Sequence, residues 1–478
     1  MQALIGRMCL DAAGYQTRRG DIKRVNGKGE IMTFETKGKE NNGAIYGRRS
    51  DWQDLYSIAK KYYEALLADP GNAQFHLTDP RGASDKSGRT FNNPYQYFFE
   101  QMHMDDAIYA DESIYEYPMQ QGGGNDGRPY SFGRPSSGGS KAAYPCKSYG
   151  QGRINPAYFY GVFDPNDMRR DVSITMTGSN GKGVEKLIPF VPNSKAEGGG
   201  LTLNKWDENR QANPWVAAQR KSGINGPYMR MSEVYLGYAE VCAALGDVVT
   251  GKQYLKTVRE RSFPQGLANT DAFIASFGND LVRAIIEERG FEYAGEGDRR
   301  WTLIRSGYLP EDIKRIKDMT KAMMDGLATK GYYEFENGNI ISAYIWTKLV
   351  DAKTIYGHRL TAQCPTDKVN DPVLYPGWRG QKDNWEEMGL NYGSSTPATN
   401  LAIKGLFEIV SEEEAASLES QGYAKVNWGI DLVDYRDEYD KYLFWDYDYV
   451  SAPIYLWPFT PNVMAAGGFT NGYGFKQE

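Results

Sequence analysis

The chain has 478 residues, enough for one large domain or a few smaller ones, and its 24% charged and 41% hydrophobic residues are typical of a globular protein. A net charge of -6, without a basic stripe or arm, argues against a nucleic-acid partner. Thirty-five tyrosines raise the aromatic content to 13%, and rings with a polar end suit contact surfaces as well as cores.

Metal-binding residues are few. The four cysteines form no Cys-x-x-Cys pair, none lies beside a histidine at ligand spacing, and the three histidines are far apart in the sequence. The runs DYDYVSAP and GGGNDGRP lack the carboxylate spacing of a calcium loop. We therefore expect no metal and no cofactor.

The sequence also predicts how the chain begins. No apolar run is long enough to cross a bilayer. The opening MQALIGRMCLDAAGY is not a signal peptide, because Arg7 and Asp11 interrupt it and Leu4, Met8 and Ala12 recur at helical spacing.

Two helices are predicted in the first seventy residues. The first covers residues 1–13 and stops at Gly14. The second covers residues 51–67, where Ser50 and Gln53 form the pattern of a capping box before an apolar stripe. A polar connection joins the two helices. Further along, NPYQYFFEQM is expected to lead into another helix.

The region of about residues 120–225 is predicted to be rich in loops. It contains QQGGGNDGRPYSFGRPSSGGS, whose Gly, Ser and Pro content favours a loop or linker. Two short pieces after it, VSITMTG and KLIPFV, are typical of strands.

A pair of helices is the clearest feature of the second half. One covers about residues 228–246 and ends at Gly246, and GKQYLKTVRERS supplies its partner. The pair resembles one tetratricopeptide unit, and the two helices at the start of the chain are expected to form another. The predicted core-facing stripe consists of Met231, Tyr235, Tyr238, Cys242 and Leu245.

The stretch IIEERGFEYAGEGDRRWTLIRSG decides whether the chain is interpreted as an enzyme. A helix over residues 281–293 places Glu288 and Glu292 one turn apart and side by side. A glycosidase instead needs two carboxylates on opposite sides of a bond, roughly 5–9 Å apart. Four arginines in the same stretch would keep these acids ionised, so we favour a structural ion network between helices over catalysis.

After Gly307 the pattern weakens, and residues of about 306–440 are predicted to be a second loop-rich insertion. Within it, AYIWTKLVDAKTIYG is compatible with either helix or strand. The run SEEEAASLESQGYAK begins with an N-cap serine and acids in the first turn, which predicts a helix. The acidic run DYRDEYD is interpreted as a solvated helix face.

Four blocks resemble, in order, the signatures of the SusD/RagB family: PYMRMSEVYLGYAEVCAALGD, YLKTVRERS, the charged stretch above, and YLWPFTPNVMAAGGFTNGYGF. The matching residues are Arg230, Glu233, Ala239, Glu240, Gly246, Glu288, Arg289, Glu292, Glu296, Gly297, Arg299 or Arg300, Leu303, Ile304, Arg305, Pro458, Asn471, Gly472 and Tyr473.

This resemblance implies a mostly α, SusD-like fold, with tetratricopeptide-like helix pairs, long irregular loops and a few short strands in a single domain over residues 1–478. The chain departs from the family at its start, where an export signal, a lipobox cysteine and the first helices are expected and Cys9 cannot replace the lipobox. The resemblance implies a structural role for Arg230, Glu233, Glu240, Glu288, Arg289, Glu292, Glu296, Arg300 and Arg305.

The resemblance also implies a function. It indicates a non-catalytic, surface-exposed lipoprotein of the outer membrane that passes oligosaccharides to a SusC-like TonB-dependent transporter. A peptide-binding protein of the same fold and a glycoside hydrolase are the alternatives. Loop aromatics with polar neighbours are favoured as ligand contacts, although the tryptophans among them could equally pack beneath the loops: Trp378, Arg379, Asn384, Trp385 and Tyr392.

Overall fold

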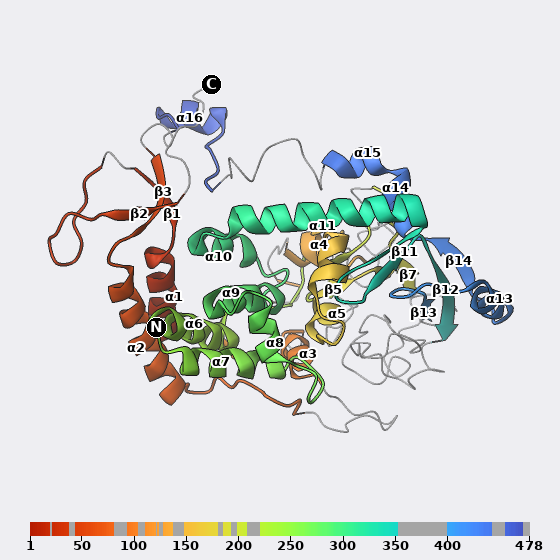
Figure 1. Cartoon of the computed structure of the whole chain (residues 1–478), viewed down its shortest axis with the longest axis horizontal. Coiled ribbons are helices and arrows are strands. Elements are labelled where there is room, and N and C mark those ends of the chain that lie inside the picture. The colour runs from red at the N-terminus through yellow and green to blue at the C-terminus, as the bar shows by residue number, and fades with distance from the viewer. Residues whose placement is uncertain are drawn as a thin grey trace.

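The computed structural model describes most of the chain, in stretches separated by gaps. These stretches are residues 1–19, 22–37, 44–80, 93–103, 110–120, 122–123, 128–136, 148–179, 185–192, 198–207, 220–351, 399–441 and 455–471. The described part is mostly helical, with short two- and three-stranded sheets, which confirms the predicted fold class (Figure 1).

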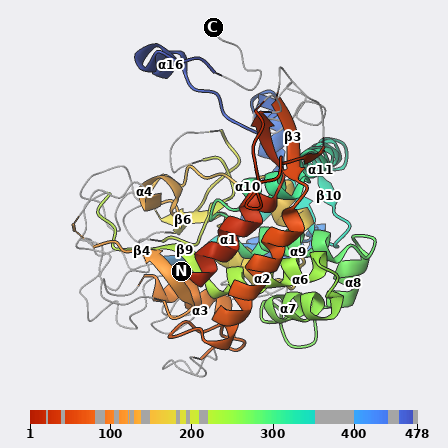
Figure 2. The same ribbon diagram turned by 90° about the vertical axis from the view of Figure 1, so that its left-hand side faces the viewer.

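The chain begins with a pair of helices, and a small sheet lies between them in the sequence. Helices α1 (Gln2–Ala13) and α2 (Trp52–Ala68) lie side by side (Figure 2), as their apolar stripes predict. The segment between them forms an antiparallel sheet of order β1-β3-β2. Its strands are β1 (Gln16–Arg19), β2 (Phe34–Thr36) and β3 (Ala44–Arg49).

The capping box predicted at the start of α2 is wrong. Asp51 is the N-cap residue, and it makes no side-chain cap hydrogen bond. Ser50 instead bonds Thr33 beside β2, since the Thr33 hydroxyl donates to Ser50 Oγ at 2.7 Å and the Ser50 amide donates to the Thr33 carbonyl. The local pattern assigns Ser50 to the cap of the helix, but in the structure this serine is hydrogen-bonded beside the sheet between the two helices.

The middle of the chain contains short elements. The two strand-like pieces predicted there are confirmed, and β6 pairs with β7 while β5 pairs with β8. In chain order the elements are α3 (Pro94–Gln101), β4 (Ser113–Tyr117), α4 (Arg128–Phe132), the π-helix η1 (Tyr158–Val162), α5 (Arg169–Ser173), β5 (Ile174–Thr175), β6 (Thr177–Ser179), β7 (Glu185–Leu187), β8 (Thr202–Leu203) and β9 (Gly226–Arg230).

The second helix pair packs against the first pair. Its members are α6 (Met231–Ala244) and α7 (Val248–Glu260), and α6 packs against α2 on one side and α9 on the other. Because α6 is covered from several directions, its polar Ser232, Glu233 and Glu240 are buried. Of the predicted apolar stripe, Met231, Tyr238 and Cys242 are buried, and Tyr235 and Leu245 are partly buried. The next elements are α8 (Thr270–Ala275), α9 (Leu281–Glu292) and α10 (Arg299–Ser306).

Helix α11 (Leu309–Lys330) corrects the prediction that residues from about 306 onward form a loop-rich insertion. It has 22 residues and runs across the molecule above α9 and α10 (Figure 1). Its ends carry ordinary signals: a proline and acids in the first turn, and Gly331 at φ 76° after the last. It buries a face that includes Met323 and Leu327 against the largest apolar cluster.

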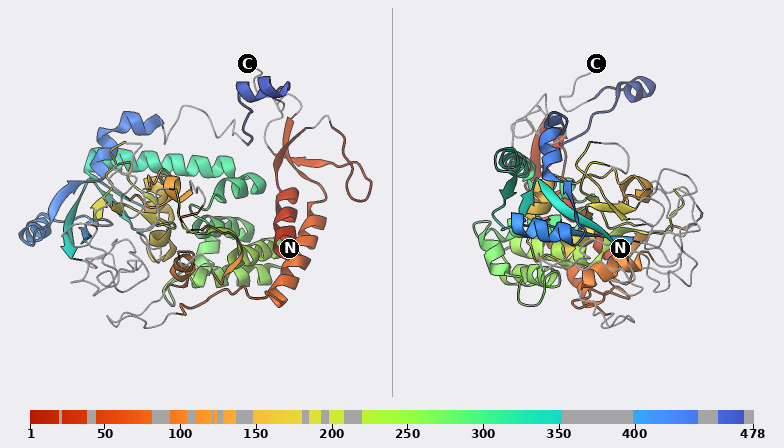
Figure 3. Two further views of the ribbon diagram at one scale, coloured as in Figure 1. Left: turned by 180° about the vertical axis from the view of Figure 1, so that it is seen from behind. Right: turned by 90° about the vertical axis from the view of Figure 1, so that its right-hand side faces the viewer.

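The remaining elements lie at the end of the molecule opposite α1 and α2 (Figures 1 and 3), except for α16. The ambiguous run after Ala343 forms strand β12, at the centre of the antiparallel sheet β13-β12-β14, and Ser411 caps α13 as predicted. The elements are β10 (Tyr332–Glu334), β11 (Ile340–Ser342), β12 (Tyr344–Asp351), β13 (Thr399–Lys404), α13 (Glu412–Ser420), β14 (Ala424–Asn427), α14 (Gly429–Asp434), α15 (Arg436–Tyr439) and α16 (Pro461–Gly467).

Residues 455–471, here called the C-terminal arm, begin beside the β1–β3 sheet and contain α16, which lies away from that sheet (Figure 2). Asn471 from the family signature closes the arm on itself, because its Oδ1 accepts from the Phe459 amide at 2.8 Å and its Nδ2 donates to the Phe459 carbonyl at 3.0 Å. The arm contacts the sheet where Tyr455 stacks on Tyr46, with ring centroids 3.7 Å apart.

Close helix packing depends on two glycines. The ring of Tyr63, from α2, lies against Gly6 of α1 and Gly237 of α6. A Cβ on Gly237 would stand 2.8 Å from Tyr63 Cζ, and one on Gly6 would come closer still. Glycine is unfavourable within a helix, so its presence here reflects the space that the tyrosine takes.

Candidate functional site: a buried ionic network

The five loop residues predicted to contact a ligand, Trp378, Arg379, Asn384, Trp385 and Tyr392, lie outside the described residues. Their role therefore stays a prediction. The charged family signature is described in full, and it forms the most distinctive chemical feature of this structure.

Helix α9 carries the acids of that signature. It begins at Asp280, whose side chain accepts a hydrogen bond from the Arg283 amide, and it is covered on nearly every side. Glu287, Glu288 and Glu292 are all buried, so each needs a partner inside the protein.

Glu292 lies at the centre of the largest group of ion pairs. Its Oε1 accepts hydrogen bonds from Arg230 and from Arg261 Nη2 at 2.7 Å, and its Oε2 accepts from Arg169 Nη1 at 3.2 Å. Arg230 and Arg261 also share Glu112, at 3.2 and 2.5 Å. One carboxylate of α9 thus joins α5, the end of β9 and the residue that follows α7.

This group continues along α9 and beyond its end. Glu288 pairs with Arg169 at 2.7 Å. Glu296 accepts hydrogen bonds from Lys205 Nζ at 2.7 Å and from Arg230 Nη2 at 2.9 Å. Burial lowers the pKa of the Lys205 ammonium to about 8, although Glu296 acts against that shift.

Glu287 is the centre of a second group, which joins α9 to α10 and α11. Arg299 Nη2 lies 2.6 Å from its carboxylate, Arg315 Nη2 lies 2.7 Å away and Arg283 Nη1 3.4 Å away. Asp312 on α11 shares Arg299 at 2.7 Å. Burial by itself would raise the pKa of Glu287, but the three guanidinium groups lower it to about 2.

Two further pairs connect helices near α10. Arg305 Nη2 donates to Glu240 Oε2 at 2.8 Å, and the Tyr56 hydroxyl donates to Glu240 Oε1 at 3.0 Å, so this pair joins α10, α6 and α2. Arg289 Nη2 donates to Asp298 Oδ1 at 2.6 Å, which links α9 to the start of α10.

The last members of the predicted scaffold set are Glu233 and Arg300. Glu233 pairs with Arg7 of α1, whose Nε lies 2.5 Å from Glu233 Oε1. In the Arg-Arg pair it is Arg299 that joins the Glu287 group, whereas the Arg300 guanidinium lies 5.8 Å from the ring centroid of Trp457. The other seven residues of that set form ion pairs between structural elements.

The chemistry of these acids is that of a scaffold. Arginine neighbours hold the pKa of Glu287 and of Glu292 below the usual range despite burial, so both carboxylates stay ionised and neither suits a general acid. They lie at helix contacts and do not face each other across a bond-sized gap. In the acidic run near the C-terminus, Asp434, Asp437 and Glu438 are exposed, as expected for a solvated face.

Sequence reasoning did not identify most partners of the signature acids. These partners come from segments far from α9, and nothing in their local pattern indicates burial. Arg261 and Arg259 fall inside the run YLKTVRERS that the family signature includes, which is the one available signal. The missed partners are Arg7, Glu112, Arg169, Lys205, Arg259, Arg261, Arg283, Asp312 and Arg315.

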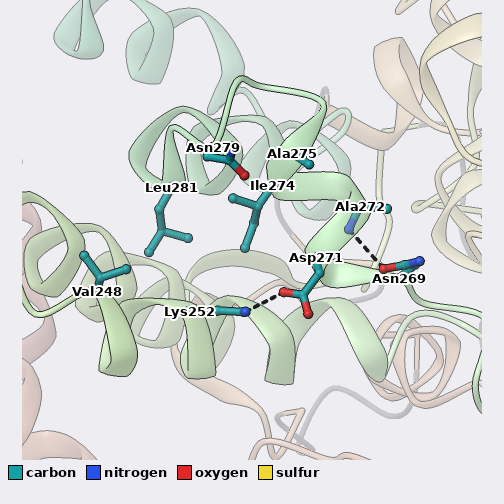
Figure 4. A pocket seen from close by; sticks show the side chains of 9 residues that line it. All are labelled: Val248, Lys252, Asn269, Asp271, Ala272, Ile274, Ala275, Asn279 and Leu281. Carbon is teal, nitrogen blue, oxygen red and sulfur yellow. Dashed lines mark hydrogen bonds and ion pairs between the residues drawn. The ribbon is translucent and has the colours of Figure 1, made fainter.

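A hollow of about 680 Å³ opens between α7, α8 and the start of α9 (Figure 4). Lys252 and Asp271 form an ion pair at 2.5 Å beside it, and both side chains are largely exposed. Ile274 and Leu281 supply apolar lining. With one solvated ion pair and aliphatic walls, the hollow lacks the convergent buried polar groups of a specific small-molecule site.

Within the described parts of the chain, no three His, Cys, Asp or Glu side chains are grouped so that they could hold a metal ion. The run DYDYVSAP and residues 124–127 of GGGNDGRP lie outside those parts. Cys9 and Cys242 are buried free thiols. No helix among the described residues is both long enough and apolar enough to span a bilayer.

Known proteins resemble the chain over parts of their length. A SusD-like protein of Formosa agariphila is 28% identical over 160 residues, 33% of this chain and 26% of that protein. A SusD homologue from Bacteroides thetaiotaomicron is 16% identical with a TM-score of 0.39, covering 66% of this chain and 55% of that one. Surface glycan-binding protein A from the same organism, solved with laminarihexaose, is 18% identical with a TM-score of 0.38, covering 54% and 52%.

The chain thus spans about a quarter of the curated relative's length and about half of each of these solved chains. The family model covers much more of it. The model of the SusD family matches residues 74–458, which include α3 to α11 and every acid of the ionic network, and the chain therefore belongs to the SusD family.

Proposed function

We propose that this protein binds glycan chains at the cell surface without cleaving them. Proteins of the SusD family are generally non-catalytic binding proteins. The observation that carries the proposal is the state of the signature acids: they are buried, ionised and held by arginines between helices. Carboxylates in this condition hold a fold together and cannot reach a glycosidic bond.

The wider setting is part of the same proposal. The protein is a surface-exposed lipoprotein of the outer membrane, and it passes oligosaccharides to a SusC-like TonB-dependent transporter. Family membership supports this setting. The loop residues Trp378, Arg379, Asn384, Trp385 and Tyr392 remain the proposed sugar contacts within the segment around residues 378–392, because aromatic faces and amide or guanidinium groups match the two surfaces of a sugar.

Affinity gel electrophoresis with a panel of soluble plant and host polysaccharides tests the binding. Retardation by at least one polysaccharide, without release of reducing ends over long incubation, is the expected result. Release of reducing ends that one Asp or Glu substitution abolishes would establish a hydrolase instead. No retardation by any member of the panel, together with peptides found by mass spectrometry in the purified protein, would point to the peptide-binding alternative.

The transporter is tested separately. Purification of the protein from the outer membrane of its own organism, after mild detergent extraction, should bring the transporter with it. Recovery of the protein alone, with the transporter present in the same extract, would contradict the proposed partnership and leave glycan binding in place.

A further inference from the structure

The two-stranded ribbon formed by β4 and β9 displays three tyrosines on its outer face. The register of the ribbon shifts on both sides of Tyr115, so the exposed Tyr115 pairs with the buried Met229. Glu116 and Met229 are buried. Their neighbours Tyr115, Tyr117 and Tyr228 are 54%, 50% and 39% exposed. The ribbon lies beside the start of α1 (Figure 2).

The three rings contact one another edge to face. Tyr115 and Tyr228 have centroids 5.6 Å apart at 87°, Tyr117 and Tyr228 are 5.2 Å apart at 78°, and Tyr115 and Tyr117 are 6.1 Å apart at 69°. Each ring therefore stands at a steep angle to the other two. Together they form an aromatic corner, here called the tyrosine corner, that is open to solvent.

The inner side of the ribbon fixes this arrangement. The buried Glu116 carboxylate accepts hydrogen bonds from the Ala110 amide at 3.0 Å, the Asn225 side chain at 2.8 Å and the Ser113 hydroxyl at 2.5 Å. Because strand residues alternate, a fixed Glu116 sets the direction of the tyrosines on both sides of it. A corner that is already ordered loses little conformational freedom when it binds a ligand.

Arg7 contacts the third ring, that of Tyr228, and its own positive charge is paired within the protein. Its guanidinium lies 4.8 Å from the Tyr228 ring centroid and donates to the Tyr228 carbonyl at 2.6 Å. The same guanidinium is paired with Glu233. The cation in contact with Tyr228 is thus neutralised within the protein, which favours an uncharged ligand over an acidic one.

Tyrosine is the ring type that suits a carbohydrate. Its face covers the apolar C–H side of a sugar, and its hydroxyl reaches the ring of sugar hydroxyl groups. A peptide that added to this ribbon would instead use the backbone of a strand edge, and that mode needs no tyrosine on the face.

We propose that Tyr115, Tyr117 and Tyr228 form a binding site for an uncharged glycan chain. This inference rests on the proposed function, of which it names one contact surface. Each ring packs against a sugar face, and the hydroxyl groups supply hydrogen bonds at the rim of the corner.

The test compares the wild-type chain with a Tyr115→Ala/Tyr117→Ala/Tyr228→Ala variant, using whichever neutral polysaccharide of the panel retards the wild type most. The expected result is a loss of affinity of at least about tenfold, since a loss of ~1.4 kcal/mol corresponds to that factor. Trp301→Ala is the control, because Trp301 is 60% exposed on α10 and should leave affinity unchanged.

A second measurement needs no substitution. Tetranitromethane nitrates exposed tyrosines, and saturating polysaccharide should slow nitration of the tyrosine corner, read by peptide mass spectrometry. Tyr344 and Tyr435, at 37% and 38% exposed, are internal controls that should react at an unchanged rate.

The outcomes separate this inference from the proposed function. Wild-type retardation with equal affinity in the triple variant, or unchanged nitration of the corner, overturns the site and leaves glycan binding in place. If the wild type binds no polysaccharide, both the proposed function and the proposed site are contradicted. Loss of peptide binding but not of polysaccharide binding in the triple variant assigns the corner to peptides and also overturns the inference.

Discussion

Replacing Glu292 with glutamine tests the ionic network at its centre. The substitution keeps the shape of the side chain and removes one negative charge. Glu292 accepts hydrogen bonds from Arg169, Arg230 and Arg261, all of which are buried. A glutamine amide must turn its NH₂ group toward at least one of these guanidinium groups, so a donor faces a donor.

The size of the effect follows from that geometry. Removing one partner of a buried ion pair costs about 3–5 kcal/mol, because the remaining charge is left without compensation. Glu112 still serves Arg230 and Arg261, and Asp167 still pairs with Arg169 at 2.7 Å, so the loss should not exceed that range. Domains are stable by only about 5–15 kcal/mol, and a loss of this size is therefore large.

Urea unfolding followed by tryptophan fluorescence gives the measurement. The expected result for Glu292→Gln is an unfolding midpoint shifted far below that of the wild type. Glu438→Gln is the matched control, because it removes one negative charge from an exposed position on α15 and should shift the free energy of unfolding by less than ~0.5 kcal/mol.

Two results would contradict this reasoning. If Glu292→Gln unfolds at the same urea concentration as Glu438→Gln, the network does not hold the helices together. If Glu292→Gln keeps its stability but loses a hydrolytic activity that the wild type shows, the carboxylate takes part in catalysis and the scaffold interpretation is wrong.

Three other predictions concern packing, pH and the C-terminal arm. Gly237→Ala should lower the free energy of unfolding by about 1–3 kcal/mol, because the new methyl group meets Tyr63, whereas Gly27→Ala adds a methyl group in open space and should be nearly neutral in the same urea assay. The folded-state pKa of Glu287 is about 2, below its usual value of about 4.3. The stability that this ionised carboxylate contributes is therefore complete above about pH 4.3 and is lost as the pH falls toward 2. The urea midpoint of the wild type should decline between about pH 6 and about pH 2.5, and that of Glu287→Gln should decline less steeply. Asn471→Ala should speed hydrogen exchange within the C-terminal arm and leave the unfolding temperature unchanged.

Local sequence patterns predicted the helices that bury a face. The apolar spacing of residues 1–13, 51–67 and 281–293 places α1, α2 and α9 within one or two residues of their observed ends. Spacing works here because each helix must turn its apolar residues toward a core. It does not predict the cap of α2, because Ser50 bonds Thr33, which lies 17 residues earlier, directly before β2.

Helix α11 shows a different limit. Its first half carries many charged residues and is only partly buried, so the apolar stripe emerges mainly near Met323 and Leu327. The end signals at Pro310 and Gly331 are clear, yet a weak stripe between them led to the prediction of a loop. The end signals and the apolar stripe together predict a helix better than either feature does alone.

The side-by-side position of Glu288 and Glu292 was predictable, because residues four apart lie on one face of a helix. Their partners were not, since an arginine such as Arg169 lies 123 residues from Glu292 along the chain and resembles any surface arginine until the fold is known. Burial of both residues of an ion pair depends on the tertiary structure, so a local sequence pattern does not indicate it.

The ionic network and the tyrosine corner are parts of one structure. Arg230 is the last residue of β9 and pairs in register with Ser113, the first residue of β4. Glu112, directly before β4, bonds Arg230 at 3.2 Å, so the network closes the buried end of the ribbon that displays the tyrosines. A buried ion pair contributes little net stability, but its groups are satisfied in one arrangement of the chain only. Buried charges at one end of the ribbon can thus set the position of the tyrosines that we propose as ligand contacts.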